Sequence, residues 1–333
     1  MAVLCVTHCS ECNGQRAKGR FSALPVAVAY FLKHWSGPAF IQRKRRQPGL
    51  VIEKDKEDMR IGSYNLRRAK LDQDSLENNW QLREPRLLAS FQDNDFDICG
   101  VQEVDEEQQH SLPALLAQRG LEYDSHFFSP YADDGNGSKA HGLLWKKSRF
   151  TQVGQAHHFW ISDPPEKKQY NDTVPSMKKN FIRGGFCLTL QEKDGQKLFV
   201  MVTHAPLNKE QHARNAHIFE QMEKKYNPQK YPSFFLGDFN ANEDDACSRM
   251  YRSYWTDSYH AFDGHPQARK GPEGSFNAWR MPAPPQAYRI DFIYFREEGI
   301  VPQAYVCNNR MYDGGYPSDH FPVYIDCKLK ELT

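Results

Sequence analysis

An apolar segment that ends in two polar residues places the strongest constraint on how this chain can fold. Residues 234–242 read FFLGDFNAN, and Asp238 and Asn240 follow the apolar run after Gly237, which leaves room for a close approach to the backbone. Side chains two residues apart in an extended segment point to the same face, and open α/β sheets bind ligands beyond the carboxyl ends of their strands. The segment therefore predicts a buried strand with a ligand site at its end. A strand closed by an Asx-type turn is the alternative.

Strand and helix patterns alternate along the chain from Met59 onward. Apolar runs of strand length mix with amphipathic runs of helix length, and the turn at residues 192–196 joins two strands directly. Such a mixture predicts an α/β or α+β layered sandwich rather than a purely parallel sheet. The predicted strands are 60–65, 96–104, 141–147, 183–191, 197–205, 232–240, 288–295 and 321–329, the predicted helices are 75–92, 105–120 and 208–226, and the predicted long surface loops are 129–139 and 164–179.

The composition bounds the class of protein. The chain has 333 residues of which 39% are hydrophobic, which is enough for a large core in one domain or in two small ones. The formal net charge of +1 creates no strong field that would select nucleic acid or a membrane as partner. Among the 8 cysteines, Cys5, Cys9 and Cys12 cluster near His8, but zinc sites usually need two separated ligand pairs. We therefore expect buried, reduced thiols and a cytoplasmic protein.

The first 58 residues differ in composition from the rest. The apolar run at 22–35 is too short to span a bilayer, so we expect no transmembrane segment. It starts late for a signal peptide, which is the alternative and would make the protein secreted. The segments QRKRRQPG and EKDKED then follow with the charged composition of a linker. We expect residues 1–58 to be an appendage or linker and residues 59–330 to form the catalytic domain.

Polar side chains recur at the ends of the predicted strands. Each has a plain structural explanation when it is taken alone, such as an N-cap, a turn or a satisfied core histidine. Together they bring carboxylate, carboxamide and imidazole groups to several strand edges, which is what a hydrolytic metal site needs. These residues are Asn65, Glu103, His204, Asp238 with Asn240, Asp291, and Asp319 with His320.

The types of these residues favour one kind of metal. Asn65, Glu103 and Asp319 are hard oxygen donors, and no trio rich in Cys or His accompanies them. Such a set favours Mg²⁺ or Mn²⁺ over Zn²⁺. Magnesium held by carboxylates is the usual arrangement for phosphate chemistry, since the ion neutralises charge that develops on the phosphoryl oxygens.

The remaining polar residues suit proton transfer. The histidines fit proton transfer or electrostatic clamping of a phosphate, and such a histidine needs an orienting acceptor. Asp291 is the natural carboxylate partner for His320. Asp238 is then left to orient and deprotonate the attacking water, and Asn240 to hold phosphate or water through its amide.

Five short motifs resemble those of the endonuclease/exonuclease/phosphatase superfamily. They are YN at 64–65, QEV at 102–104, GDFNA at 237–241, RIDFIYF at 289–295 and SDHFPV at 318–323, in family order over about residues 59–330. The superfamily includes deoxyribonuclease I, AP endonucleases, deadenylases, neutral sphingomyelinases and inositol polyphosphate 5-phosphatases. The resemblance implies an α/β (α+β) fold, a four-layered sandwich of two face-to-face mixed β-sheets flanked by helices. It also implies that Asn65, Glu103 and Asp319 bind the divalent metal.

The resemblance further assigns the acid–base residues. The Asp and Asn of the GDFN motif, here Asp238 and Asn240, handle the nucleophilic water and the phosphate in the family. The motif histidine, here His320, pairs with the aspartate at Asp291. His204, in the segment VTHAP, corresponds to the other histidine of nuclease-like members.

Four further residues bear on the substrate. Arg67 stands two residues after Asn65, where AP endonucleases carry an acid and deoxyribonuclease I carries an arginine that contacts phosphate. We expect Arg67 and Arg183 to grip phosphate, with a solvated surface charge as the alternative. Phe276 and Trp279 precede the Asp291 strand, where nucleic-acid enzymes of this fold often stack a base or sugar. Packing in the core or a loop is the alternative for both aromatics.

These features together predict a Mg²⁺- or Mn²⁺-dependent hydrolase of phosphate esters, acting as a phosphodiesterase on nucleic acid. The alternatives are a phosphomonoesterase, a lipid phosphodiesterase of sphingomyelinase or inositol-phosphatase type, and an inactive phosphate-binding module. The complete ligand set argues against the inactive module. We find neither a 5-phosphatase signature nor a membrane-inserting hairpin in the sequence, and this makes the lipid substrates less favoured than nucleic acid. We expect a monomer.

Overall fold

The computed structural model describes residues 58–130, 139–168, 183–193, 195–207, 209–280 and 288–330, which form two β-sheets flanked by helices. The first sheet has seven strands, in the order β10 (Arg269–Lys270), β12 (Ile300–Cys307), β13 (Val323–Leu329), β1 (Met59–Asn65), β2 (Ile98–Val104), β4 (Ala140–Lys146) and β3 (Tyr123–Phe128). The second sheet has six strands, in the order β5 (Phe150–Trp160), β6 (Gly184–Glu192), β7 (Lys197–His204), β8 (Ser233–Asp238), β11 (Asp291–Phe295) and β9 (Thr256–Asp257).

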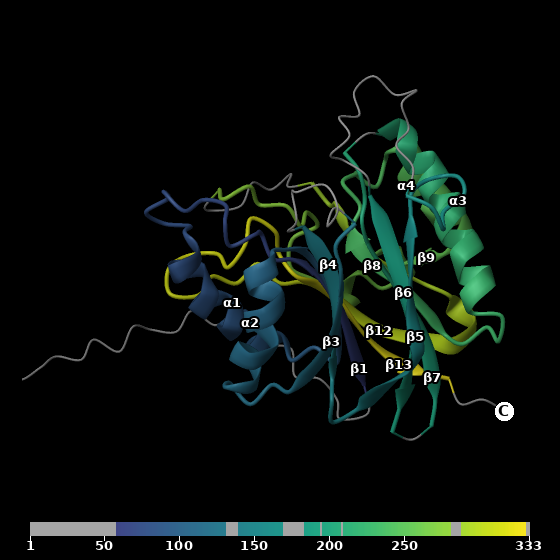
Figure 1. Ribbon diagram of the computed structural model, residues 1–333, viewed down its shortest axis with the longest axis horizontal. Helices are drawn as coiled ribbons and strands as arrows, with labels where there is room; N and C mark the ends of the chain where they lie inside the picture. The colour runs from purple at the N-terminus through teal and green to yellow at the C-terminus, as the bar shows by residue number, and fades with distance from the viewer. Residues whose placement is uncertain are drawn as a thin grey trace, which may run out of the picture. The chain divides into compact units, whose positions relative to one another are not determined.

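Helices cover the outer faces of both sheets (Figure 1). Helices α1 (Trp80–Asn94) and α2 (Glu106–Ala117) pack on the first sheet, and α3 (Lys209–Tyr226) and α4 (Ala246–Tyr254) pack on the second. Short 3-10 helices span His260–Phe262, Pro266–Ala268 and Glu297–Gly299. The predicted fold class, a mixed sandwich of two sheets between helical layers, is confirmed.

The core between the sheets is apolar and fully buried. Ile61 of β1 and Ile98 of β2 face Val200 of β7, Leu236 of β8 and Ile293 of β11, and none of these side chains is exposed to solvent. Removing a buried side chain of this kind costs about 2–5 kcal/mol, because the cavity left behind does not close completely. The packing therefore fixes the position of one sheet relative to the other, and with it the positions of the residues at the ends of their strands.

Strand register brings three predicted site residues into a row. In the parallel pair of β7 and β8, His204 lies opposite Asp238, and in the antiparallel pair of β8 and β11, Asp291 lies opposite Asp238. Gly237 precedes Asp238, and a Cβ atom at this glycine would lie 2.5 Å from the Thr203 carbonyl oxygen. The room at Gly237 therefore admits the neighbouring strand β7 rather than a ligand.

Several predicted boundaries need correction. The first helix begins at Trp80 rather than at residue 75, because the Asn79 side chain accepts a hydrogen bond from the Leu82 amide and caps it. Strands β3, β5 and β12 and helix α4 were not predicted. β3 and β5 are edge strands, and β12 contains Pro302 at a register shift, so their sequences lack a regular apolar pattern.

Other predictions fall partly outside the described residues. Residues 1–57, with the Cys5, Cys9 and Cys12 cluster, lie outside them, as do most of the two long loops predicted at 129–139 and 164–179. The prediction of buried thiols is confirmed for five cysteines, which are Cys99, Cys187, Cys247, Cys307 and Cys327. Within the described residues, every helix is too short or too polar to cross a membrane.

Candidate active site

The predicted site residues gather where strands of both sheets end. A cavity of about 410 Å³ opens there, and its wall contains residues from both sheets and from the loops that follow or precede their strands. Its lining includes nine of the twelve predicted site residues and leaves out Asn65, Asp291 and Trp279. The nine are Arg67, Glu103, Arg183, His204, Asp238, Asn240, Phe276, Asp319 and His320.

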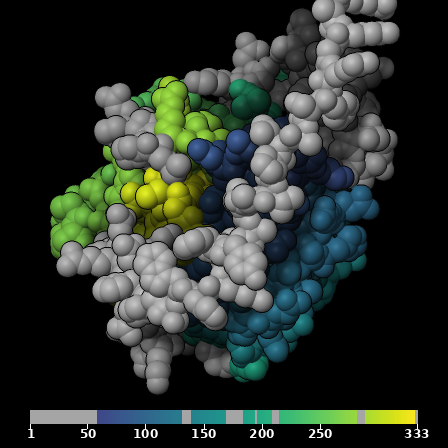
Figure 2. Space-filling view, turned by 90° about the vertical axis from the view of Figure 1, so that its left-hand side faces the viewer, coloured from purple at the N-terminus to yellow at the C-terminus, as the bar shows by residue number. Residues whose placement is uncertain are grey.

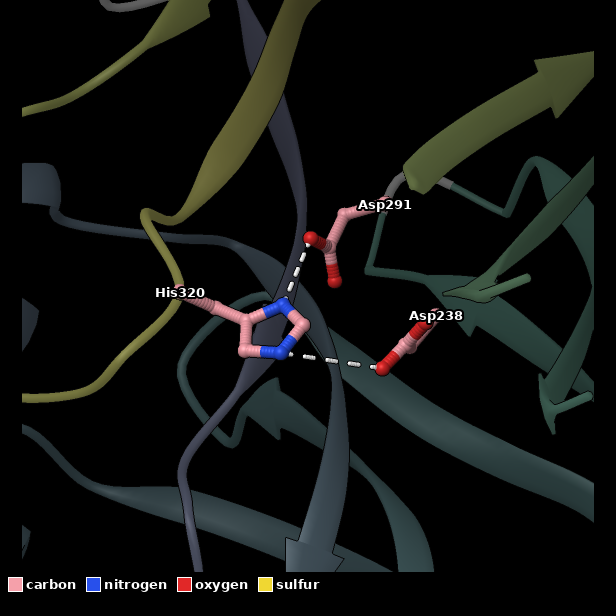
Figure 3. A group of neighbouring side chains, drawn as sticks. All are labelled: Asp238, Asp291 and His320. Atoms are coloured by element: carbon pink, nitrogen blue, oxygen red, sulfur yellow. Dashed lines mark hydrogen bonds and ion pairs between the residues drawn. The ribbon is translucent and has the colours of Figure 1, made fainter. Parts of the chain in front are cut away.

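Two aspartates flank one histidine, of which Asp238 and His320 line the cavity and Asp291 is buried behind them (Figure 3). His320 Nδ1 lies 2.8 Å from Asp291 Oδ2, and His320 Nε2 lies 3.9 Å from Asp238 Oδ2. His204 Nε2 approaches the same Asp238 oxygen at 3.5 Å from the neighbouring strand. All four side chains are buried. The pairing of Asp291 with His320, predicted from residue type, is therefore present in the structure.

Burial and charge shift the pKa values of these groups in different directions. Burial and the neighbouring charge of Asp291 raise the pKa of Asp238 to about 7, although His320 and a hydrogen bond from Asn65 oppose the shift. Burial lowers the pKa of His320, but Asp291, Asp238 and Asp319 outweigh it and raise that pKa to about 10. Burial and Arg183 push the pKa of His204 well below its usual value. At neutral pH, His320 is therefore charged and His204 is neutral.

Asn240 reaches the cavity by a route that the sequence did not predict. Strand β8 ends at Asp238, and Asn240 has a φ of 50°, so the side-chain alternation of an extended strand does not continue to it. The Asn240 amide donates to Asp238 Oδ1 at 2.9 Å, and its side-chain Nδ2 donates to the Ala205 carbonyl at 2.8 Å. The Asx turn and the ligand site, weighed as alternatives, are thus both present, because the turn brings both side chains to one cavity.

The three predicted metal ligands lie in and beside the same cavity. Asn65 Nδ2 donates to Asp238 Oδ2 at 2.9 Å, and its Oδ1 accepts from the Arg67 amide at 3.0 Å. Glu103 has a φ of 55°, an uncommon conformation for this residue type, and its Oε2 is buried without a hydrogen-bond donor. Burial raises the pKa of Asp319, and the charge of Glu103 adds to the shift. The Glu103 oxygen that lacks a donor and the neighbouring charge of Asp319 suit a hard divalent cation.

A second group could also hold a metal. Donor atoms of Asp238, Asp291 and His320 lie within 4.8 Å of one another. His320 Nδ1 and Asp291 Oδ2 are already hydrogen-bonded to each other, so this group is better suited to hold protons and charge. The Glu103 side of the cavity is therefore the better candidate for a cation.

The predicted substrate-binding residues separate into two groups. Arg183 and Phe276 line the cavity, and the Phe276 ring centroid lies 4.9 Å from that of His320. Arg67 also lines it, but its guanidinium contacts Asp72 at 2.9 Å and Asp319 at 3.2 Å. Trp279 does not line the cavity. It packs against the core, which is the alternative that the sequence left open.

Other residues of the cavity were not predicted. Lys139 comes just before β4, and burial together with the charges of Arg68 and Arg183 lowers its pKa. Tyr288 lies on the cavity wall three residues before Asp291, and it is 60% exposed. Tyr288 fell inside the predicted strand 288–295, whereas β11 begins at Asp291, and nothing in the segment YRID marks it as exposed. No local pattern distinguishes Lys139 from other surface lysines.

Comparison with known proteins identifies the family of this chain. The family model described as endonuclease/exonuclease/phosphatase family matches residues 62–320. The chain belongs to this family. Its members hydrolyse phosphate esters. A comparison with curated protein sequences gives no significant match.

Solved structures of the family share the fold. An endonuclease/exonuclease/phosphatase family protein from Bacteroides thetaiotaomicron is 22% identical, with a TM-score of 0.69 over 84% of this chain and 100% of that one. A mannosyl-6-phosphatase from the same organism is 23% identical, with a TM-score of 0.68 over 81% and 99%. The human Nocturnin catalytic domain is 20% identical, with a TM-score of 0.63 over 85% and 99%. These identities support the fold and leave the substrate open.

Proposed function

We propose that this protein is a Mg²⁺- or Mn²⁺-dependent phosphodiesterase that hydrolyses nucleic acid. The observation that carries the proposal is the arrangement of three residues, in which Asp238 and His320 line the cavity and Asp291 is bonded to His320 behind them. A buried carboxylate with a pKa of about 7 lies 3.9 Å from an imidazole with a pKa of about 10. A base that titrates near neutral pH and a fixed positive charge are what attack by water on a phosphate ester needs.

Each residue has a defined role in this proposal. Asp238 accepts the proton of the attacking water, which its raised pKa favours at neutral pH. His320 keeps its proton because Asp291 accepts from Nδ1, and its positive charge faces the phosphate oxygens as they become more negative. Neutral His204, 3.5 Å from Asp238, orients the base, and Asn240 offers its second amide hydrogen to phosphate or water.

The cation is assigned to three residues. Asn65, Glu103 and Asp319 would hold Mg²⁺ or Mn²⁺, which suits their oxygen donors and the buried Oε2 of Glu103. When bound, the ion neutralises charge that develops on the phosphoryl oxygens.

Catalysis is assigned to residues 59–330, so we expect a chain that starts at Met59 to keep full activity.

The two ends of the cavity support nucleic acid as the substrate. Lys139 and Arg183 come just before β4 and β6, whereas Phe276 and Tyr288 come before β11. In the second sheet, strands β7 and β8, which carry His204 and Asp238, lie between β6 and β11. Cations at one end and aromatic rings at the other fit a strand in which phosphates alternate with flat bases.

A substrate panel tests the proposal. Purified protein with Mg²⁺ is offered single- and double-stranded DNA, RNA, sphingomyelin, inositol phosphates and bis-p-nitrophenyl phosphate. We expect turnover of nucleic acid and of the bis-p-nitrophenyl ester. Preferential release of inorganic phosphate from monoesters, or turnover of sphingomyelin, would overturn the nucleic-acid assignment, and binding without any turnover would identify an inactive module.

Removal of metal tests the cation separately. EDTA is expected to abolish turnover, and added Mg²⁺ or Mn²⁺ to restore it, because the carboxylates around Glu103 need a counter-charge before phosphate can approach. Glu103→Gln should raise the Mn²⁺ concentration needed for half-maximal activity. Full activity after exhaustive chelation would disprove metal dependence.

A further inference from the structure

Arg83, in helix α1, is a fully buried arginine whose hydrogen bonds within the described part of the chain all go to backbone oxygens. Its Nε donates to the Asn78 carbonyl at 2.8 Å. Its two terminal nitrogens donate to four more carbonyls, those of Leu66 at 3.0 Å, Arg67 at 3.1 Å, Pro317 at 3.3 Å and Arg68 at 2.9 Å. Among the described residues, no carboxylate lies within ion-pair distance of Arg83. Burying an arginine in this way is costly, so its position needs an explanation.

The acceptors belong to two loops that carry proposed metal ligands. Residues 66–68 follow Asn65 directly, and Pro317 stands two residues before Asp319. The first and last described segments of the chain lie side by side on one face of the molecule (Figure 2). Ser318 Oγ also donates to the Asn65 carbonyl at 2.7 Å, so the two loops touch beside the arginine.

The first of these loops has an uncommon backbone. Arg67 has a φ of 55°, a left-handed conformation that costs on the order of 1 kcal/mol for a residue other than glycine. Its carbonyl accepts from Arg83 and also from Gln108 Nε2 at 3.3 Å. The Arg67 amide that donates to Asn65 Oδ1 lies in the same planar peptide unit as the Leu66 carbonyl, so the bond from Arg83 to that carbonyl also holds the orientation of the Asn65 side chain.

A third loop closes over the guanidinium. The Arg83 Cζ atom lies 5.2 Å from the Trp80 ring and 5.7 Å from the Trp279 ring. In the loop of Trp279, the Asn277 amide donates to the Asp319 carbonyl at 2.8 Å. Trp279 therefore contacts Arg83, which holds the ligand loops, and does not line the cavity.

We propose that Arg83 is a positioning residue whose planar guanidinium fixes the loops of Asn65 and Asp319 at the spacing that the divalent cation requires. The inference rests on the proposed metal site. A lysine at this position would keep the charge but offer one nitrogen instead of three, so it cannot hold both loops. The arginine is thus placed for the geometry of its donors.

The experiment measures binding of Mn²⁺ alone, by electron paramagnetic resonance, in the absence of substrate. Arg83→Lys keeps the charge and should weaken Mn²⁺ binding about tenfold or more, as is usual when a group that supports metal ligands is lost. Arg83→Met removes a positive charge near the cation. Electrostatics alone would then make Mn²⁺ bind more tightly, whereas the positioning role predicts weaker binding.

The matched control is Arg86→Lys. Arg86 lies in the same helix and also donates to a carbonyl, that of Glu77 at 3.0 Å, but it contacts neither ligand loop by any hydrogen bond. Its substitution should leave the Mn²⁺ affinity unchanged. Thermal unfolding of the metal-free proteins shows which variants fold.

The outcomes separate the inference from the proposed function. If the unmodified protein binds no Mn²⁺, the metal site itself is wrong. If it binds Mn²⁺ and the folded Arg83→Lys variant binds it equally well, only the positioning role is wrong. If Arg83→Lys does not fold, Trp279→Leu, which removes one covering ring, should still weaken Mn²⁺ binding severalfold. Unchanged binding in that variant, or loss of its fold, would make Arg83 a core residue and overturn the inference.

Discussion

The two ends of strand β1 carry buried charges in opposite arrangements. At one end, Arg60 Nε and its NH2 nitrogen contact the two oxygens of Asp326 at 2.7 and 2.9 Å, and a third nitrogen donates to the Asn94 carbonyl at 2.7 Å. The guanidinium also stacks 4.3 Å from the Tyr324 ring centroid. At the other end, beside Asn65, two buried carboxylates, Asp238 and Asp291, flank the single charged His320, and the charge of Asp291 adds to the burial that raises the pKa of Asp238.

This difference shows that the charges at the Arg60 end of β1 stabilise the fold and that those at the Asn65 end destabilise it. A buried charge that is matched in number and geometry is neutralised on folding, so the Arg60 end is a structural element. Like charges crowded together cost stability, and proteins retain them where they do chemistry. The proposed active site lies at the end of β1 where the charges are not matched.

Removing the carboxylate that pairs with Arg60 should give the largest effect, which is on stability. Asp326→Asn leaves Arg60 buried and without its carboxylate, and we expect a loss of about 3–5 kcal/mol in the free energy of unfolding. The turnover number of the remaining folded protein should not change. Urea denaturation followed by circular dichroism measures the loss. Asp124→Asn, which breaks an exposed pair with Lys147 at 3.5 Å, is the control and should cost less than about 1 kcal/mol.

Breaking the unmatched end should affect catalysis instead. Asp238→Asn removes the base, and we expect kcat to fall about a hundredfold or more with KM little changed. Stability should stay the same or rise, since a crowded buried charge is removed. Single-turnover kinetics on the best substrate measures the effect. The control is Asp245→Asn, a carboxylate on the wall of the same cavity. Near-normal kcat for Asp238→Asn would show that the base is misassigned.

The pH dependence of stability should distinguish the two ends as well. Both Asp238 and His320 have pKa values that are raised in the folded state, to about 7 and about 10. Folding stabilises the protonated form of a group whose pKa it raises. The contribution of each of these two groups to the free energy of unfolding is therefore greatest at low pH and is lost as pH rises. The Asp238 contribution is lost between about pH 4 and 7, and the His320 contribution between about pH 6.5 and 10.

Variants isolate these contributions. In metal-free protein, the fall in unfolding free energy should be smaller by at least about 2 kcal/mol in Asp238→Asn over the lower window, and similarly in His320→Gln over the upper one. Asp326→Asn should keep the pH profile of the unmodified protein, because the pKa of Arg60 is raised further above its already high value. Parallel profiles for all variants would contradict the assigned charge states.

The smallest effect is expected at Arg67. Because Asp72 and Asp319 already hold its guanidinium, Arg67→Ala should lower kcat/KM by less than about tenfold. If Arg67 also contacts a phosphate, the slope of log affinity against log salt for nucleic acid should decrease by about one. An unchanged slope would limit Arg67 to holding the Asp319 carboxylate. Arg86→Ala, in helix α1, removes a partly buried arginine that does not line the cavity and is the control.

The sequence by itself determined the strands that carry site residues at their ends and left β3, β5 and β12 unpredicted. Asp238, Asp291 and His320 could be recognised because burial of an apolar run and its sudden end in a polar residue are local properties of the chain. The motifs around them were short and in order, so the fold and the family followed. Asn240 was placed correctly in the cavity but through the wrong backbone, since a φ of 50° leaves no mark in an extended pattern.

Tertiary structure alone decided which of these ends meet and how their charges act on one another. The pKa of Asp238 depends on Asp291, which becomes its neighbour only through the pairing of β8 with β11. The place of Arg83 depends on the Pro317 carbonyl, 234 residues away in the chain. In the sequence, Arg83 looks like any arginine of an amphipathic helix. Its role arises because folding brings distant carbonyl groups to one buried point, where each unpaired polar group would be costly and a planar guanidinium can bond to five of them.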